Sequence, residues 1–351
     1  MINNIPFFIN AMGDQDEIFL SAFSRYVINV RKKPSISLED ITVCKQRINE
    51  CDKIDEILIL PSTEYLNRVL LDITDDLRKE GVILPLCPKE LYLLISDKYS
   101  FGKLCIENDI LVPDELYNPQ LKDIPFVAKP KQYFNDWRKM VAERPFLVKD
   151  ELSYRQLKKN KTLFYQKYVK GKSIYLLYYF SKEGTYSVYS QENLLQQSQG
   201  KSIIGAISSD IHLDLISKKF AQLLLGLRFC GLIMIELRSF NGQFYMIEAN
   251  PRLWGPSQLI LDAGMNLFYL FANDYNLVTA CNTAIGYKSG VRYFWSGGIF
   301  EDQGKGNEIS LYGYDKDLFF EEYSEWLKSD IYLREDTVRI FLKNAYTQPS
   351  N

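Results

Sequence analysis

The chain has 351 residues, enough to bury a substantial core and to form two or three domains or subdomains. Hydrophobic residues make up 46% of it and charged residues 25%, as is ordinary for a soluble globular protein. With 42 Lys and Arg against 44 Asp and Glu, the net charge is −2, so nothing indicates a nucleic-acid partner.

Cysteine and histidine exclude several kinds of site. The 6 Cys include no CxxC pair and His212 is the single histidine, so we do not expect zinc. A Ser-His or Cys-His nucleophile would have to use His212, which no GxSxG motif accompanies, and we expect it in a surface or capping role. No signal peptide or membrane-length apolar stretch is recognised, and we expect a cytoplasmic protein without a membrane partner.

The first 95 residues predict an irregular α/β unit. Residues 7–9 and 26–30 are weak strand candidates. An apolar strand over 56–60, a periodic helix over 65–79 and a short strand over 82–84 follow one another. This β-α-β rhythm predicts a parallel sheet.

The central and C-terminal parts predict a mixture of strands and helices. In chain order we expect a helix from Pro88, a helix over 98–108 capped by Ser96-Asp97, a strand over 126–129 stopped by Pro130, a polar loop over 131–145, a strand over 163–169, a β-meander over 173–209, an amphipathic helix over 210–228, a hairpin over 231–250, a helix over 257–262, and tail helices over 317–328 and 336–343.

The hairpin carries the most specific chemistry. Asn241-Gly242 lies between two apolar, β-favouring runs, which is the strongest short-range hairpin signal. Because strand side chains alternate between faces, we expect Glu236 and Arg238 to share one face with Glu248 and Asn250. Two carboxylates that face each other among apolar neighbours need compensation. Mg²⁺ provides it, because this ion commonly binds one or two protein carboxylates plus nucleotide phosphates.

Lysines occur upstream at positions suited to phosphate binding. Lys129 closes a strand against Pro130, and Lys98 lies in the first turn of a helix, whose N-terminus favours anions. Lys167 lies in an extended segment over 165–171 that ends in glycine, and backbone groups of such a segment can contact an adenine edge. No complete P-loop and no GxGxxG motif occurs, so a different nucleotide site is expected.

Taken in order, these motifs resemble the ATP-grasp superfamily, in particular its carboxylate–amine ligases with a carbamoyl-phosphate-synthetase-like nucleotide domain. The resemblance covers roughly residues 55–300. Residues 257–264 and 290–295 also look like the branch that contains amino-acid ligases such as D-aspartate ligase. The matching segments are Ser96-Asp97-Lys98-Tyr99, Phe126-Val-Ala-Lys129-Pro130, Gln166-Lys167-Tyr168-Val169-Lys170-Gly171, and Glu236 with Glu248-Ala-Asn250-Pro-Arg252.

The resemblance implies a nucleotide site built from the upstream motifs. Lys98 and Lys129 would hold the α- and β-phosphates of ATP. Gln166 would accept a hydrogen bond from the adenine amino group. The backbone of Lys167, Tyr168 and Val169 would contact the ring.

The resemblance also implies the catalytic end of the site. Glu236, Glu248 and Asn250 would bind Mg²⁺, with Mn²⁺ as an alternative ion. Arg252 would stabilise the transferred phosphoryl group or an acyl-phosphate, so Glu248, Asn250 and Arg252 are the expected catalytic residues. Such a site needs no His or Cys, because phosphoryl transfer relies on positioning and charge neutralisation.

Two positions depart from the family pattern. The loop after Lys129 lacks the usual glycines, so either Lys131, Arg138 or Lys139 substitutes with side-chain charge or the loop has another task. Ser173 stands where the family often has a carboxylate for the ribose, and its hydroxyl would bind ribose more weakly.

Arg292 has two readings of equal weight. Its guanidinium could recognise a substrate carboxylate. It could equally pair with an acidic residue in a purely structural role.

We therefore expect an α/β (α+β) protein with the ATP-grasp fold, in which a parallel-sheet N-terminal domain precedes two α+β subdomains that enclose a nucleotide. Its parts would be an N-terminal domain over 1–95, an ATP-grasp domain over 96–303 and a helical tail over 304–351. The ATP-grasp domain would divide into a small β-rich subdomain over about 125–170 and a C-terminal subdomain over about 171–303.

The expected function is that of an ATP- and Mg²⁺-dependent, ADP-forming ligase that makes an amide or peptide-like bond through an acyl-phosphate. Its partners would be small-molecule carboxylate and amine substrates, with a homodimer left open. The alternatives are a nucleotide-binding protein of the same fold without ligase activity, and a small-molecule kinase.

Overall fold

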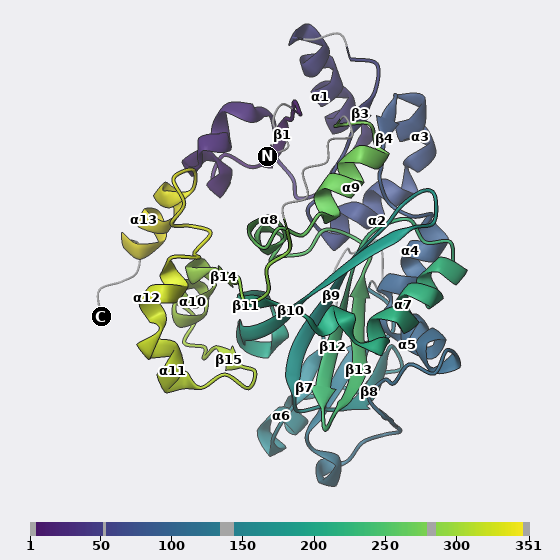
Figure 1. The fold of residues 1–351 in the computed structure, drawn as a ribbon, viewed down its shortest axis with the longest axis vertical. Helices are drawn as coiled ribbons and strands as arrows, with labels where there is room; N and C mark the ends of the chain where they lie inside the picture. The colour runs from purple at the N-terminus through teal and green to yellow at the C-terminus, as the bar shows by residue number, and fades with distance from the viewer. Residues whose placement is uncertain (1–4, 52–53, 134–143, 279–285, 347–351) are drawn as a thin grey trace.

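The computed structural model describes residues 5–51, 54–133, 144–278 and 286–346 (Figure 1). The N-terminal part has two short parallel pairs in place of one continuous sheet. β1 (Ile9–Met12) pairs with β2 (Val27–Arg31), and β3 (Ile57–Leu58) pairs with β4 (Val82–Ile83). The parallel β-α-β rhythm predicted between residues 56 and 84 is therefore confirmed.

Helices of the N-terminal part differ from the prediction in two places. The helix expected over 65–79 is two helices, α2 (Glu64–Asp72) and α3 (Thr74–Lys79). Thr74 Oγ1 donates to the Leu71 carbonyl at 3.0 Å, and such back-bonding competes with regular helix geometry. The sequence pattern also missed α1 (Leu38–Cys51), whose start is capped by reciprocal hydrogen bonds between Ser37 and Asp40.

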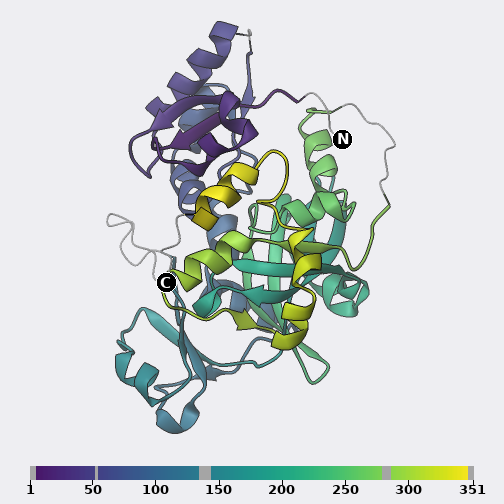
Figure 2. The same ribbon diagram turned by 90° about the vertical axis from the view of Figure 1, so that its left-hand side faces the viewer.

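The small β-rich lobe is a four-stranded sheet in the order β5-β8-β6-β7. Figure 2 shows this lobe extending away from the rest of the chain at lower left. Its strands are antiparallel throughout. The elements are β5 (Glu115–Leu116), β6 (Phe126–Pro130), β7 (Phe146–Val148), α6 (Glu151–Gln156) and β8 (Leu163–Lys167).

A seven-stranded sheet forms the centre of the molecule, in the order β13-β12-β9-β10-β11-β14 with β15 also paired to β10. The predicted meander and hairpin are both confirmed in it. The strands are β9 (Lys172–Phe180), β10 (Tyr186–Gln196), β11 (Ile203–Ser209), β12 (Gly231–Phe240), β13 (Gln243–Asn250), β14 (Arg292–Phe294) and β15 (Ser310–Leu311).

Helices cover both faces of this sheet, so its central strands are buried almost throughout (Figure 1). One face packs on α4 (Lys89–Ser96), α5 (Lys98–Glu107) and α7 (Leu215–Gly226). The other packs on α8 (Gln258–Asp262) and α9 (Leu267–Asp274). Consecutive residues of β12 alternate between the two cores, with Ile233 in the first and Leu232 and Met234 in the second.

The C-terminal tail packs back onto the sheet. Helix α10 (Ser296–Gln303) precedes it. The tail contains α11 (Lys316–Glu321), α12 (Tyr323–Leu327), α13 (Val338–Tyr346) and β15, a strand that the sequence pattern did not predict. Trp326 is fully buried in a cluster with Phe294 and Phe319. No helix in the described ranges has the length and apolarity needed to cross a membrane.

Candidate functional site

Glu236 and Glu248 are direct cross-strand partners on β12 and β13. The turn that joins the strands has Asn241 and Gly242 at φ values of 50° and 75°, as a type I′ hairpin requires. Glu236 is buried, with 5% of its surface exposed, so it is not a solvent-facing strand carboxylate.

A bulge is needed to bring these carboxylates together. From the turn inward, Phe240 pairs with Gln243 and Leu237 with Met246, a register that would place Glu236 opposite Ile247. The register shifts by one residue between Glu236 and Leu237, so that Glu248 takes the position opposite Glu236. The expected shared face is present, but an unbulged hairpin would have put the two carboxylates on opposite faces.

Lys98 and Asn250 both contact Glu248. The Lys98 ammonium forms an ion pair with Glu248 Oε2, and Asn250 Nδ2 donates to Glu248 Oε1 at 3.0 Å. Burial opposes ionisation of Glu248, but the charge and hydrogen bond from Lys98, the bond from Asn250 and the charge of Arg252 outweigh it and lower the pKa of Glu248 to about 2. The same pairing outweighs burial at Lys98 and raises its pKa.

Glu236 has a different environment. Burial raises the pKa of its carboxyl, although Arg238 Nη2 lies 3.1 Å from Glu236 Oε1. The Arg238 guanidinium lies 4.0 Å from the centre of the Tyr312 ring, and among the described residues its buried Nη1 has no hydrogen-bond partner. A buried donor without a partner suits an additional anionic ligand.

Lys129 crosses from the small lobe to the hairpin. Its ammonium, on a side chain 4% exposed, donates to Gln166 Oε1 at 2.8 Å and to the Ile247 carbonyl at 3.4 Å. Both acceptors are uncharged. Burial, and then the charge of Lys98, lower the pKa of Lys129 to about 8.

The predicted adenine segment begins at Gln166, whose Nε2 also donates to the Pro113 carbonyl at 3.1 Å. The N–H groups of Lys167 and Tyr168 donate to the carbonyls of Asp114 and Pro125. Within the described part of the chain the Val169 N–H makes no hydrogen bond, so it is free to donate to a ligand.

The end of the same segment packs directly on the hairpin. A Cβ at Gly171 would lie 2.1 Å from the Ser239 carbonyl oxygen, so only glycine fits there. Ser173 is fully buried, and its hydroxyl contacts Glu236 and accepts from Asn193 at 3.0 Å. The proposed ribose contact of Ser173 stays a prediction, and it requires this hydroxyl to become exposed.

Arg252 is held by a residue that the sequence pattern did not single out. Glu64 on α2, 8% exposed, accepts from Arg252 Nε at 3.0 Å, from Tyr92 Oη at 2.6 Å and from Arg68 Nε at 2.7 Å. Arg68 in turn contacts Asp97 Oδ1 at 2.8 Å. The only sequence signal was the four-residue spacing of Glu64 and Arg68 on a helix, which does not reveal the distant partner Arg252.

Other predicted residues lie elsewhere. The expected side-chain cap by Asp97 is absent; the Asp97 carboxylate pairs with Arg68 instead. Arg292 forms an ion pair with Glu322 in the tail, so the structural alternative describes it. Lys131 lies 5.1 Å from the Tyr99 ring centre, whereas Arg138 and Lys139 fall outside the described residues.

Replacing Glu64 with Gln should impair catalysis more than nucleotide binding. An amide cannot accept from three donors as the carboxylate does, so Arg252 loses its anchor. We expect kcat to fall about 10- to 100-fold, with nucleotide affinity changed less than about threefold. Steady-state kinetics and calorimetry with an ATP analogue measure these effects. Glu322→Gln, which breaks a different Arg–Glu pair, is the matched control, and equal losses in both variants would contradict a positioning role for Glu64.

The donor set at the hairpin fits Mg²⁺. Among the described residues no cluster of three or more His, Cys, Asp or Glu side chains forms a metal site. Two facing carboxylates and the amide oxygen of Asn250 nevertheless match the oxygen ligands of an ion that completes its shell with phosphates and water. Asn250 Oδ1 accepts from Arg252 Nη2 at 3.2 Å, which places the cationic side chain beside these oxygens.

No protein-family model and no curated protein matches this sequence. Solved structures do match. An N5-carboxyaminoimidazole ribonucleotide synthetase in complex with ADP is 13% identical with a TM-score of 0.58, over 91% of this chain and 90% of that one. The biotin carboxylase domain dimer of Hydrogenobacter thermophilus 2-oxoglutarate carboxylase, in complex with MgADP, ADP and bicarbonate, is 10% identical with a TM-score of 0.56, over 82% and 68%.

A third match is pyruvate carboxylase from Rhizobium etli, with acetyl coenzyme A, at 13% identity and a TM-score of 0.54. It covers 78% of this chain but 26% of that one, so this chain spans about a quarter of the larger enzyme. These similarities show that the chain has the ATP-grasp fold, as the motifs predicted. They do not test the branch of amino-acid ligases or the roles of individual residues.

Proposed function

We propose that this protein is an ATP- and Mg²⁺-dependent carboxylate–amine ligase. The observation that carries the proposal is Lys129, a buried cation whose described hydrogen bonds reach only uncharged oxygens. A buried ammonium without a carboxylate partner is costly, and an anionic ligand removes that cost. Two further cations lie beside the hairpin carboxylates: Lys98 contacts Glu248, and Arg238 contacts Glu236. Among the described residues, the Nη1 of Arg238 has no hydrogen-bond partner.

In the proposed complex, the nucleotide lies between the small lobe and the hairpin. Lys98 and Lys129 bind the α- and β-phosphates, and Gln166 with the backbone of Lys167–Val169 contacts the adenine. Support comes from the Lys129 hydrogen bonds that join the two lobes at this point. The solved ribonucleotide synthetase and biotin carboxylase domain that this chain resembles carry ADP.

Glu236, Glu248 and Asn250 would hold Mg²⁺. When bound, the ion would offset phosphate charge and orient the γ-phosphoryl group. Arg252, fixed by Glu64, is placed to stabilise the negative charge that develops on the transferred group. No side chain acts as a covalent nucleophile in this scheme.

The proposed reaction has two steps. A carboxylate oxygen of the first substrate attacks the γ-phosphorus of ATP, and ADP leaves, which gives an acyl-phosphate. The nitrogen of an amine then attacks the carbonyl carbon, inorganic phosphate leaves and the amine loses a proton, which gives an amide. The reaction thus yields ADP and one phosphate for each amide bond.

A product assay tests the proposal. Purified protein is incubated with ATP, Mg²⁺ and panels of carboxylates and amines, including amino acids, and ADP and free phosphate are both measured. Stoichiometric ADP and phosphate with a new amide are expected. ADP without free phosphate would indicate a small-molecule kinase. Nucleotide binding without turnover across the panels would indicate a binding protein.

Nucleotide affinity should depend on pH through Lys129. Its pKa of about 8 means that the ammonium loses its charge as pH rises through this value, and with it the attraction to phosphate. We expect affinity for a non-hydrolysable ATP analogue to fall about tenfold between pH 7 and pH 9. Calorimetry at constant ionic strength measures the change. In Lys129→Arg the side chain stays charged, so the affinity should not change between pH 7 and pH 9. If the affinity of this variant falls with pH as in the parent, another group causes the effect.

A further inference from the structure

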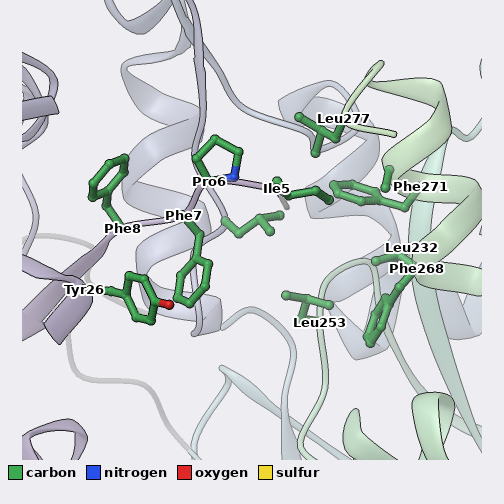
Figure 3. Close-up of a pocket in the computed structure, with 12 residues that line it drawn as sticks. Ile5, Pro6, Phe7, Phe8, Tyr26, Leu232, Leu253, Phe268, Phe271 and Leu277 are labelled. Carbon is green, nitrogen blue, oxygen red and sulfur yellow. The ribbon is translucent and has the colours of Figure 1, made fainter. Parts of the chain in front are cut away.

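A large apolar cavity lies between the N-terminal part and the central sheet. It has a volume of about 950 Å³, and none of its 12 lining residues is charged. Figure 3 shows Phe7 and Tyr26 on one side of the space, with Leu253, Phe268 and Phe271 on the other. A cavity of this size and character is typical of a site for an apolar ligand.

The surface near this cavity exposes large apolar side chains. Phe7 is 44% exposed and Leu60 is 51% exposed, and both line the cavity. Phe7 lies 4.3 Å from the Tyr26 ring, measured between ring centres, so it is already packed along one edge. Apolar side chains exposed around one concave space are expected to contact a partner.

The cavity borders the catalytic end of the site. A neighbouring pocket shares Leu60, Leu232, Leu253 and Phe271 with it and adds Arg252. This second pocket has a volume of about 20 Å³, room for one water-sized group such as a carboxylate oxygen. The apolar cavity therefore lies next to a small pocket that is lined by Arg252, the side chain proposed to stabilise the acyl-phosphate.

Strand geometry gives the distance between the two ends. Leu232 lines the cavity and Glu236 lies four residues further along β12, on the same face. At about 3.3 Å per residue, the two positions are about 13 Å apart. A substrate held at the metal end could thus place an apolar group of several carbons in the cavity.

We propose that the carboxylate substrate carries a bulky apolar group, which fills this cavity while its carboxylate lies at Arg252. The inference rests on the proposed function for the assignment of the charged end. Arg252 is paired with Glu64, but its guanidinium has N–H donors left over, and these favour an acid over an amine at this position.

Matched ligands test the inference by calorimetry in the presence of Mg²⁺ and a non-hydrolysable ATP analogue. 4-Phenylbutyrate should bind at least about tenfold more tightly than butyrate, because its ring leaves water and enters the cavity. Phe7→Asp should reduce this preference below about threefold, and Leu60→Asp should do the same. Both positions are exposed, so folding should persist, which thermal melting verifies. Phe320→Asp changes a Phe on α11 that is 61% exposed and does not line the cavity, and it should keep the preference.

Several results would overturn the inference. Equal binding of the two acids, or no binding of either, would show that the cavity takes no apolar acid. If the preference for 4-phenylbutylamine over butylamine exceeds the preference for 4-phenylbutyrate over butyrate, the cavity binds the amine substrate. Loss of a dimer in Phe7→Asp, seen by light scattering with unchanged ligand affinity, would assign the cavity to a second copy of the chain.

The proposed function can fail independently of this inference. Preference for the apolar acid without ADP release, whatever the amine, would contradict the ligase and keep the cavity assignment. Release of ADP and phosphate with small acids, without a preference for the apolar acid, would support the ligase and contradict the cavity assignment.

Discussion

Replacing Glu248 with Gln is expected to lower turnover about 1000-fold, because a ligand that offsets phosphate charge contributes several kcal/mol to transition-state stabilisation. Gln has nearly the same shape, so the hairpin register should persist. The change also removes the ion-pair partner of the partly buried Lys98 ammonium. Steady-state release of ADP and phosphate measures the loss, and it should persist at saturating ATP.

The control for this variant is Glu325→Gln, an exposed carboxylate on α12 that pairs with Lys328. It should retain full turnover. A Glu248→Gln enzyme with turnover within about threefold of the parent would show that β13 does not supply a metal ligand. Titration with Mn²⁺, followed by its electron paramagnetic resonance signal, would then also show unchanged ion affinity.

Replacing Lys129 with Met should weaken nucleotide binding and stabilise the fold. The lost charge-assisted contact to phosphate should cost about 10- to 100-fold in affinity for an ATP analogue. The pKa of about 8 lies below the ordinary 10.5, so folding disfavours the charged form. This penalty is full below pH 8 and disappears as pH rises towards 10.5. Met has no such penalty, and we expect a gain of about 1 to 3 kcal/mol at pH 7.

Two measurements separate these effects. Calorimetry gives the affinity, and thermal melting at pH 7 and pH 10 gives the stability, whose gain should shrink at the higher pH. Lys328→Met, at an exposed position, should change neither. A Lys129→Met variant that melts below the parent at pH 7 would show that the bonds to Gln166 and Ile247 outweigh the cost of the buried charge.

Local signals in the sequence were sufficient to predict the hairpin and much of the arrangement of charged residues around it. The Asn-Gly turn with flanking apolar runs predicted the hairpin because turn chemistry and strand alternation are local properties. The order of Lys98, Lys129 and the two glutamates along the chain predicted their convergence once the fold was recognised. Lys129 and Glu236 are accordingly both buried, and the Lys129 ammonium donates to the carbonyl of Ile247, the residue before Glu248.

Contacts between distant segments could not be predicted in this way. Glu64 and Arg252 are 188 residues apart, and nothing near either residue identifies the other. Ser173 is buried and accepts a hydrogen bond from Asn193 on the next strand, a contact that periodicity alone does not predict. The apolar cavity is formed by Phe7, Leu60 and the α9 side chains, which come together only in the tertiary fold.

The bulge at Ile247 also constrains how this chain can change in length. Deleting that residue would give an even ladder in which Glu248 still lies opposite Glu236, but it would remove the carbonyl that accepts from Lys129. Substituting its side chain would leave the shift intact, because the backbone supplies both the extra residue and the carbonyl that Lys129 contacts. Homologous hairpins should therefore vary freely in the identity of this residue, and a hairpin that lacks it should keep the two glutamates paired but lose this acceptor for Lys129.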